Sequence, residues 1–325
     1  MKNKIYVGID LLQKNLNMYN VPITKLNFLK RKYPFINFIP INIDKKKYPY
    51  NKIDIYWGNR ITPNIIKHST NLKWIHFGSV GVERSFCDET TKRRILITNS
   101  KGNMTDAMVA TATAFITYLS RSFHTFYKIK NNKNFNRDTY DKFFDQLTDL
   151  NGKNCFIAGM GDVGKKLSKV LEALGMNIVG KKNKSKFDKN KNHQFLQYIQ
   201  KADFIVNLLP LTKKTKKIFN KKAISLIGKK AFFINIGRGE TVDEKYLIHC
   251  LKNKKILGAA LDVFENEPLE KNSEFFKLNN VFITPHVAGV SKNYWDKQIH
   301  LFDHNLSCFL KKKYKSMENR VLKFN

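Results

Sequence analysis

The stretch from Asn154 to Gly164 reads NCFIAGMGDVG, and it sets how the second half of the chain folds. The apolar run NCFIA is typical of a buried strand, and three glycines follow it in the pattern G-x-G-x-x-G. Apolar residues then recur at helical spacing, at Leu167, Val170, Leu171 and Leu174. The pattern predicts a strand, a tight glycine turn and a helix, in that order.

Each glycine in this turn has a physical reason. Gly159 permits the sharp turn, and Gly161 lets a pyrophosphate approach the backbone. Gly164 lets the helix pack closely on the strand, and the free N–H groups at the helix start face the phosphates. The stretch therefore predicts a dinucleotide site, whose binding residues we expect to be Gly159, Met160, Gly161, Asp162, Val163 and Gly164.

The next apolar run, MNIVG, indicates which dinucleotide is bound. A strand at this position usually ends in an acid that accepts hydrogen bonds from the ribose 2′-hydroxyl. Here Lys181, Lys182 and Lys184 follow, with no acid among them. Lysines favour a 2′-phosphate, so we predict NADP(H) in preference to NAD(H). The alternative is that a lysine-rich chain places lysine everywhere.

Strand-like runs continue on both sides of this site. DFIVNLL, AFFIN, LGAALDV and NVFIT follow it, and IYVGID, INFIPINI, IDIYW, KWIHF and ILIT occupy the first hundred residues. Their alternation with polar, helix-like segments predicts an α/β fold with doubly wound parallel sheets. Residues 105–126 read as one long helix, and a last helix after Pro285 carries a packing face of Trp295, Ile299, Phe302, Leu306 and Phe309.

Composition narrows the function classes. The 325 residues are 42% hydrophobic and carry a formal charge of +33, which attracts polyanions. The lysines are scattered through the whole chain rather than gathered in one stripe, so we expect no specific nucleic-acid partner. The four cysteines form no CxxC pair, which argues against zinc and disulfides and favours a reducing, cytoplasmic location. No signal-peptide or membrane-spanning run is evident, and we expect no membrane partner.

Three polar residues stand at or just past the ends of apolar runs in the second half. They are Arg238 in NIGRGE, Glu267 in DVFENEPL and His286 in FITPHVAG. In an open parallel sheet such strand ends border the crevice where ligands bind. Taken singly, each has a plainer interpretation, as a surface arginine, a loop acid and a structural histidine after Pro285.

Taken together, GMGDVG, NLLPLTKKT, NIGRGETVDE, LGAALDVFENEPL and ITPHVAG resemble the D-isomer-specific 2-hydroxyacid dehydrogenase family. The likeness runs from about Leu72 to Gly289 and is strongest to the glyoxylate/hydroxypyruvate reductases, through IYWGN, FGSVGVE and NLLPLT. It implies two Rossmann-like doubly wound domains with a cleft between them. We expect a flavodoxin-like substrate domain (1–103 and 288–325), a dinucleotide-binding domain (104–287) and hinge closure.

Reduction of a 2-keto acid to a D-2-hydroxy acid explains the three polar residues. Arg238 can grip a carboxylate and a keto oxygen bidentately, which a lysine cannot do. His286 can donate the proton, and Glu267 beside it would stabilise the imidazolium and raise its pKa. We therefore expect Arg238, Glu267 and His286 to be the catalytic residues.

The resemblance also implies the remaining site residues. Further cofactor contacts are expected at Leu209, Pro210, Thr215, Ile236, Gly237, Asp262 and Gly289, with Asp262 near the nicotinamide carboxamide. Substrate contacts are expected at Trp57, Ser79, Val80, Gly81 and Arg238. Backbone N–H groups of the 79–81 loop would hold the substrate carboxylate. Trp57 has the alternative of a simple core aromatic.

The chain departs from the family pattern in its long helix. VATATAF stands where the family commonly has an acid-and-aromatic pattern, so the homodimer that the resemblance implies is less secure. His300 and His304 have the spacing of a metal pair, but no other ligands accompany them, and we expect no metal.

Two hypotheses follow for the function. The first is an NAD(P)H-dependent reductase of small 2-keto acids. The second is a non-enzymatic dinucleotide-binding regulator that uses the +33 charge to hold nucleic acid or an acidic partner.

Overall fold

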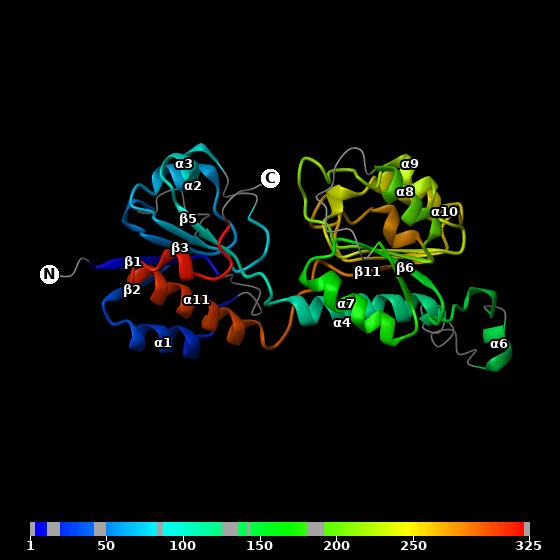
Figure 1. Cartoon of the computed structure of the whole chain (residues 1–325), viewed down its shortest axis with the longest axis horizontal. Coiled ribbons are helices and arrows are strands. Elements are labelled where there is room, and N and C mark those ends of the chain that lie inside the picture. Colours follow the sequence, from blue (N-terminus) through cyan, green and yellow to red (C-terminus); the bar gives the residue numbers. More distant parts are fainter. Residues whose placement is uncertain are drawn as a thin grey trace. The chain divides into compact units, whose positions relative to one another are not determined.

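The computed structural model describes residues 4–11, 20–41, 50–82, 87–123, 125, 136–141, 144–180 and 192–321, and Lys181, Lys182 and Lys184 lie outside them. The chain forms two compact units. One comprises Met1–Met104 and Val290–Asn325, and the other comprises Thr105–Gly289. The chain therefore passes from one unit to the other twice (Figure 1).

The first unit is built on a five-stranded parallel sheet with the order β2-β1-β3-β4-β5. Its strands are β1 (Ile5–Ile9), β2 (Ile36–Pro40), β3 (Ile55–Trp57), β4 (Trp74–His76) and β5 (Leu96–Thr98). The strand order reverses between β1 and β3, which is the flavodoxin-like pattern. Because β3 and β4 are buried on both faces, they read as mainly apolar runs in the sequence, with His76 as the polar exception.

Helices cover both faces of this sheet. They are α1 (Ile23–Lys32), α2 (Pro63–His68), α3 (Asp88–Lys92) and α11 (Tyr294–Leu310), with short 3₁₀ turns η2 (Tyr50–Lys52) and η8 (Tyr314–Ser316). Helices α1 and α11 lie on one face, and α2 and α3 lie on the other (Figure 1).

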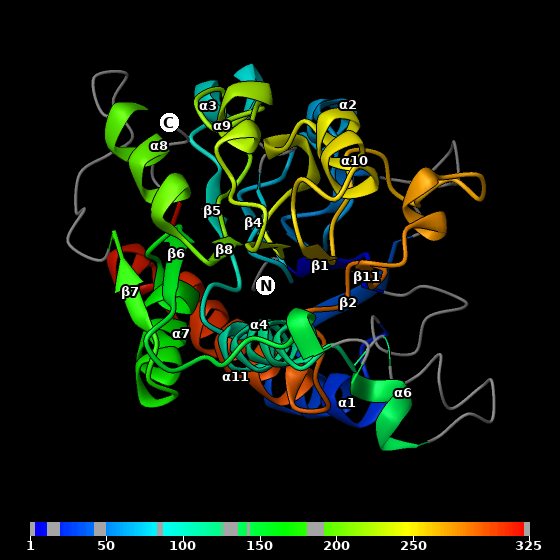
Figure 2. The same ribbon diagram turned by 90° about the vertical axis from the view of Figure 1, so that its right-hand side faces the viewer.

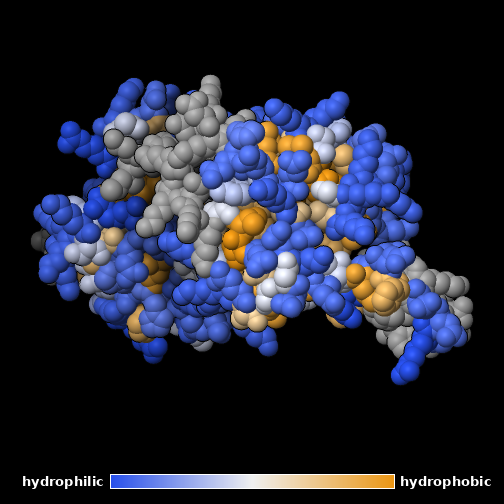
Figure 3. Space-filling view, turned by 45° about the vertical axis from the view of Figure 1, so that its right-hand side comes forward, coloured by the Kyte–Doolittle hydropathy of each residue, from blue (hydrophilic) through white to orange (hydrophobic). Residues whose placement is uncertain are grey.

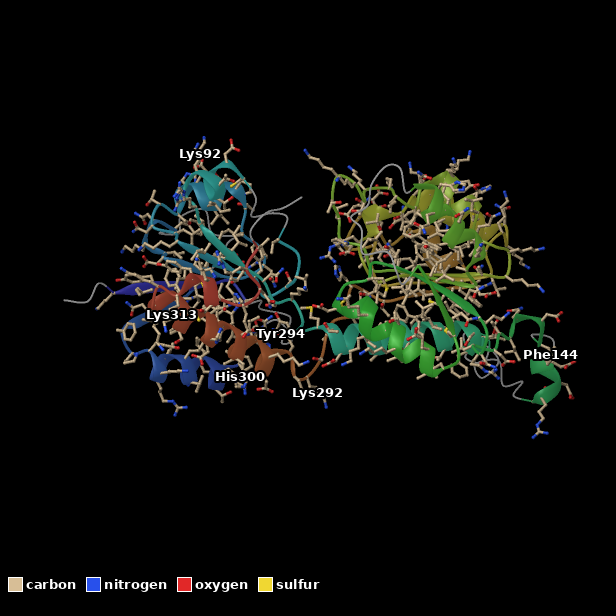
Figure 4. The ribbon with its side chains drawn as sticks, in the orientation of Figure 1. Lys92, Phe144, Lys292, Tyr294, His300 and Lys313 are labelled. Carbon is tan, nitrogen blue, oxygen red and sulfur yellow. The ribbon has the colours of Figure 1, made fainter. Side chains whose placement is uncertain are left out.

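Helix α11 ties the C-terminal segment to the first unit, and its expected packing face is confirmed. Its apolar residues are buried against β3 and β4, and the Phe302 ring stacks on Trp57 with 4.0 Å between centroids. Tyr294, which Figure 4 labels at the start of this helix, donates its hydroxyl hydrogen bond to the Gly78 carbonyl over 2.7 Å. The loop after β4 is therefore held by the C-terminal helix.

The second unit contains a six-stranded parallel sheet with the order β11-β10-β9-β8-β6-β7. Its strands are β6 (Asn154–Ala158), β7 (Asn177–Val179), β8 (Phe204–Asn207), β9 (Phe232–Asn235), β10 (Gly258–Leu261) and β11 (Val281–Ile283). Every strand predicted from the sequence is thus present. The order reverses between β6 and β8, so the glycine turn after β6 lies at the point where such sheets bind ligands.

Alternate residues of the central strands pack on opposite faces, as a doubly wound sheet requires. Helices α4 (Thr105–Ser120) and α7 (Asp162–Ala173) cover one face, and α8 (Asn192–Lys201), α9 (Lys221–Ser225) and α10 (Glu244–Lys252) cover the other (Figure 2). In β8, for example, Phe204 and Val206 face α4 and α7, whereas Ile205 faces α8. The remaining short elements are α6 (Arg137–Asp141), η4 (Phe144–Gln146), η6 (Gly239–Thr241) and η7 (Glu274–Lys277).

Helix α4 is shorter than the sequence predicts. It ends at Ser120 rather than at residue 126. Ser122 adopts a left-handed backbone with φ of 50°, and the Ser120 carbonyl accepts a hydrogen bond from Thr148 N–H instead of continuing the helical ladder. A tertiary contact therefore terminates the helix where local composition does not.

The coloured residues on the face drawn in Figure 3 are mostly hydrophilic, with hydrophobic residues in separate patches. Within the described part of the chain, no helix is both long and apolar enough to span a membrane. Among the same residues, no cluster of three or more histidines, cysteines or acids is placed to hold a metal ion.

Candidate active site

The glycine turn after β6 has the geometry of a phosphate-binding loop. Gly159 has φ of 113°, which side chains rarely tolerate. A Cβ on Gly164 would lie 2.2 Å from the Gly159 carbonyl oxygen, so this glycine lets the helix pack on the turn. A Cβ on Gly161 would meet nothing within 4 Å, and no side chain caps the start of α7. The turn thus offers open space and uncapped N–H groups to an anion.

The other predicted residues of this turn differ in exposure. Met160 and Val163 are half-buried and pack against the α4 and α7 side of the core, whereas Asp162 is exposed in the first helical turn. The exposed backbone at Gly161 faces open space. A nicotinamide dinucleotide fits such a loop through its pyrophosphate.

A buried polar network joins the carboxyl ends of β8 and β9. The Asn207 amide donates to Asn235 Oδ1 over 2.9 Å and to Thr241 Oγ1 over 2.7 Å. The Asn207 and Asn235 side-chain oxygens accept from the N–H groups of Leu209 and Gly237, over 3.1 Å in both cases. The network shapes the two turns that were expected to line the cofactor.

Those two turns also pack against each other. A Cβ on Gly237 would lie 2.8 Å from the Leu209 carbonyl oxygen, so only glycine fits between them without displacement. Thr215 is buried and donates its hydroxyl hydrogen bond to the Pro210 carbonyl over 2.6 Å, which closes the second turn. Leu209 and Ile236 are buried and Pro210 is exposed, so Pro210 is the member of this group that presents side-chain surface.

Arg238 leaves the end of β9 and is partly buried. Its Nη1 donates to the Gly237 carbonyl over 2.7 Å. Its own carbonyl accepts from Thr241 Oγ1 over 2.6 Å and from the Asn235 amide over 3.3 Å. The buried network therefore fixes the Arg238 backbone, and one guanidinium nitrogen is anchored within the turn.

Glu267 and His286 form a hydrogen-bonded pair. His286 Nδ1 lies 2.7 Å from Glu267 Oε2, and the other carboxylate oxygen accepts from Phe264 N–H over 3.0 Å. Burial opposes ionisation of Glu267, but the hydrogen bonds from His286 and Phe264 and the charges of His286 and Arg238 together hold its pKa below the ordinary value. Arg238, Glu267 and His286 therefore lie close enough together for the charges of Arg238 and His286 to lower the pKa of Glu267.

Asp262 organises the segment that carries His286. Its oxygens accept from Thr284 Oγ1 over 2.5 Å, from Val287 N–H over 2.8 Å and from Ala288 N–H over 2.9 Å. The side chain is 1% exposed. A carboxylate has about four acceptor positions, so about one remains for another donor such as a carboxamide.

Two further predicted residues lie in different units. Gly289, expected at the cofactor, is half-buried and ends the second unit. Trp57, expected to wall a substrate pocket, is 0% exposed in the core of the first unit. A wholly buried ring cannot line a pocket, so the expectation for Trp57 is wrong and the alternative of a core aromatic holds.

The predicted substrate loop, Ser79 to Gly81, follows β4. Ser79 O accepts from Ser100 N–H over 3.0 Å, and Val80 O accepts from the Asn99 amide over 2.9 Å. The Val80 and Gly81 N–H groups donate to no acceptor in the described part of the chain. Val80 is 44% exposed. The loop is held through its carbonyls and leaves backbone donors available.

Sequence reasoning missed several buried polar residues that follow strands in one or the other unit. The Asn207–Asn235–Thr241 network is one case. Another is Asp10, which is 1% exposed at the end of β1 and accepts from Arg60 N–H over 2.9 Å and from Arg60 Nε over 3.1 Å. The signal for both was a polar residue directly after an apolar run, as in IYVGID and DFIVN.

Comparisons with known proteins agree with this geometry. Residues 113–288 match the family model described as D-isomer specific 2-hydroxyacid dehydrogenase, NAD binding domain. The chain is 31% identical to a glyoxylate reductase of Pyrococcus horikoshii over 260 residues, which cover 78% of this chain and 77% of the relative.

Two solved structures share the fold. An NADPH-dependent glyoxylate/hydroxypyruvate reductase of Sinorhizobium meliloti, in complex with NADP and malonate, superimposes with a TM-score of 0.78 at 20% identity, over 98% of this chain and 97% of the other. A D-lactate dehydrogenase of Aquifex aeolicus, complexed with NAD and lactic acid, gives 0.80 at 21% identity, over 98% and 100%. The chain therefore belongs to the D-isomer-specific 2-hydroxyacid dehydrogenase family, whose members are NAD(P)-dependent oxidoreductases that act on CH–OH groups.

Proposed function

We propose that this protein reduces small 2-keto acids of the glyoxylate and hydroxypyruvate type to D-2-hydroxy acids. The observation that carries the proposal is the 2.7 Å contact between His286 Nδ1 and Glu267 Oε2. The charge of Arg238 also helps to lower the pKa of Glu267. These residues follow β9, β10 and β11 in the unit that also holds the glycine turn. A cation, a proton donor and a dinucleotide loop are the parts that keto-acid reduction requires.

Arg238 binds the substrate in this proposal. Its planar guanidinium presents two parallel N–H donors to a carboxylate and a keto oxygen, and it stays charged at all physiological pH values. The hydrogen bond from Nη1 to the Gly237 carbonyl already restricts the side chain, which lowers the side-chain entropy that is lost on binding. Arg238 thereby orients the carbonyl carbon and stabilises negative charge as it develops on the oxygen.

His286 supplies the proton. The bond to Glu267 leaves Nε2 as the atom that donates to the developing alkoxide. The ionised Glu267 fixes the orientation of the imidazole and stabilises its protonated form before the transfer. The reduced nicotinamide, when bound, supplies the hydride.

The remaining assignments are proposals of the same kind. The unit comprising Thr105–Gly289 holds the dinucleotide, and the N–H groups of Ser79, Val80 and Gly81 in the other unit bind the substrate carboxylate. NADP(H) is preferred over NAD(H), because lysines and no acid follow β7 in the sequence. The S. meliloti structure, with bound NADP, is consistent with that preference, whereas the A. aeolicus structure holds NAD.

We also propose that the protein is a homodimer. Phe123 and Phe144, near the end of α4, are 47% and 69% exposed, and Figure 4 marks Phe144 at the edge of its unit. Large apolar side chains that stay exposed are candidates for burial between subunits. Sedimentation measurements on wild type and Phe144→Lys test this, and a wild-type monomer contradicts it.

The test of the function is consumption of NADPH and NADH with glyoxylate, hydroxypyruvate and pyruvate. We expect turnover of at least one keto acid, faster with NADPH, and loss of turnover in Arg238→Ala and His286→Ala. Binding of both dinucleotides, measured by fluorescence, shows whether an inactive variant still holds its cofactor. Absence of turnover with the whole panel, or equal rates in wild type and both variants, overturns the proposal.

A further inference from the structure

The Arg238 turn and the Glu267 loop meet at a single peptide group. A Cβ on Gly239 would lie 1.9 Å from Phe264 C and 2.4 Å from Glu265 N. Backbone atoms cannot yield to such a contact as a flexible side chain can. The residue after Arg238 therefore packs directly on the Phe264–Glu265 peptide, and no other residue type fits there without displacement.

The same peptide is held from a second direction. Glu265 N–H donates to Glu244 Oε1 over 2.5 Å. Glu244 is the first residue of α10 and is partly buried. The neighbouring Phe264 N–H donates to Glu267 Oε1 over 3.0 Å, and Glu267 in turn contacts His286. A displacement of this peptide would therefore also move Glu267, through the hydrogen bond from Phe264 N–H, and so alter the contact between Glu267 and His286.

We propose that Gly239 and Glu244 are positioning residues that clamp the Phe264–Glu265 peptide and so set the distance between the Arg238 guanidinium and the His286 imidazole. The inference rests on the proposed function, because it assigns the two residues a role in that reaction. Gly239 acts through shape, and Glu244 acts as a hydrogen-bond acceptor. Neither touches the substrate.

Burial and the neighbouring charge of Lys217 act on the pKa of Glu244 in opposite directions. Burial raises the pKa of Glu244 to about 7, and the backbone bond from Glu265 and the charge of Lys217 partly offset this, whereas Glu265 and Glu240 reinforce it. Lys217 pairs with Glu265 over 2.7 Å and also donates to the Val242 carbonyl over 3.0 Å. The hydrogen bond that Glu244 accepts is strongest when the carboxylate is ionised.

The experiment compares three variants on one turn of α10. Glu244→Leu removes the acceptor, Glu244→Gln keeps an acceptor oxygen without charge, and Asp243→Ala removes the helix cap, whose carboxylate accepts from Tyr246 N–H over 3.2 Å. We expect Glu244→Leu to lower kcat by about tenfold, with dinucleotide Kd unchanged, since positioning errors act on the chemical step. Glu244→Gln retains most of the activity. Asp243→Ala loses stability but keeps kcat.

A double-mutant comparison of Glu244→Leu with Glu267→Gln shows whether Glu244 acts on kcat through Glu267 or through a general loss of structure. In a Glu267→Gln background, Glu244→Leu should lower kcat by less than about twofold, because residues that act through one another are not additive. Gly239→Ala, which pushes the same peptide without a change of charge, gives an independent second variant.

Wild-type kcat in both Glu244→Leu and Gly239→Ala overturns the inference. Full additivity with Glu267→Gln, or a Glu244→Gln variant as slow as Glu244→Leu, also overturns it. Arg238→Lys and His286→Gln are assayed in the same series. If these two variants have the kcat of wild type, the proposed function itself is wrong. If they lose activity while Glu244→Leu and Gly239→Ala keep the kcat of wild type, only the positioning role of Glu244 and Gly239 is wrong.

Discussion

At the scale of single residues, His286 is held in an unusual backbone conformation. Its φ is 56°, which few residues other than glycine adopt. His286 N–H donates to the Asp262 carbonyl over 2.8 Å, and Asp262 also accepts from Val287 and Ala288. Backbone strain that the surroundings stabilise is typical of functional sites. The fixed turn directs the imidazole toward Glu267.

We expect Glu267→Gln to lower kcat for keto-acid reduction by about tenfold to a hundredfold. Glutamine still accepts from Phe264 N–H, so the loop keeps its shape, but the charge that stabilises protonated His286 is lost. Steady-state kinetics at pH 7, with dinucleotide Kd as the control, provide the measurement. A kcat within twofold of wild type would mean that Glu267 is only a loop acid.

The buried acid Glu244 makes a prediction about stability and pH. Its pKa in the folded protein, about 7, lies above the ordinary value of 4.5. The folded state therefore holds the proton more tightly, and ionisation costs stability as pH rises from about 4.5 through 7. At pH 8 we expect Glu244→Gln to be more stable than wild type by about 1 to 2 kcal/mol after allowance for solvent screening.

The difference between Glu244→Gln and wild type should vanish at about pH 3, well below the ordinary pKa of 4.5, where Glu244 is protonated in both folded and unfolded chains. Urea unfolding at the two pH values measures it. A glutamine variant that is less stable than wild type at pH 8 contradicts the assignment.

The residue types at the site could be predicted from sequence, but their supports could not. Arg238, Glu267 and His286 stand beside apolar runs within motifs, so their type and position were visible. The contact between Gly239 and the Phe264–Glu265 peptide joins positions far apart in the chain, and no local pattern marks it. Trp57 shows the opposite failure, because an aromatic at a strand end has the same local signature in a pocket and in a core.

At the scale of elements, the glycine turn between β6 and α7 separates two uses of glycine. Gly161 has φ of −74°, which alanine adopts without strain, and its Cβ would meet nothing within 4 Å. Gly164 has no such room, because its Cβ would press on the Gly159 carbonyl oxygen at 2.2 Å. The first glycine leaves space for a ligand, and the second serves helix packing.

We therefore expect Gly161→Ala to keep its stability within about 1 kcal/mol of wild type while weakening dinucleotide binding by about tenfold or more. Gly164→Ala should lose about 1 to 3 kcal/mol of stability through overpacking. Thermal unfolding and fluorescence titration with NADPH measure the two effects. Unchanged NADPH affinity in Gly161→Ala would contradict the role given to this turn.

Sequence patterns predict which elements are present better than they predict where an element ends. The strands of the described residues were visible as apolar runs, and the central ones, such as β8 and β9, are buried on both faces and carry few polar residues. The end of α4 was missed by six residues, since Ser122 and the contact from Thr148 terminate the helix through backbone geometry. Composition alone gave no stop signal between residues 120 and 126.

At the scale of the whole molecule, the charge of +33 has to be reconciled with an enzymatic role. Exposed lysines occur in both units, for example Lys92 in the first unit, which Figure 4 labels, and Lys165 in the second. A dispersed charge attracts any polyanion without selecting one. The regulator hypothesis, by contrast, requires a selective nucleic-acid or acidic partner.

We expect the protein to bind duplex DNA weakly and without sequence preference, with an affinity that falls steeply as salt rises. Filter binding with several unrelated duplexes, from about 50 to 200 mM salt, measures this. Binding that survives the higher salt and discriminates among the duplexes would favour the regulator hypothesis instead.

The central claim is that Arg238 recognises a keto acid through a bidentate contact and that His286 protonates it. Its most direct test is kcat/KM for glyoxylate with NADPH in wild type and in Arg238→Lys, which keeps the charge but loses the planar pair of donors. We predict a fall of about a hundredfold or more, with NADPH affinity unchanged. A lysine variant as efficient as wild type would contradict the account.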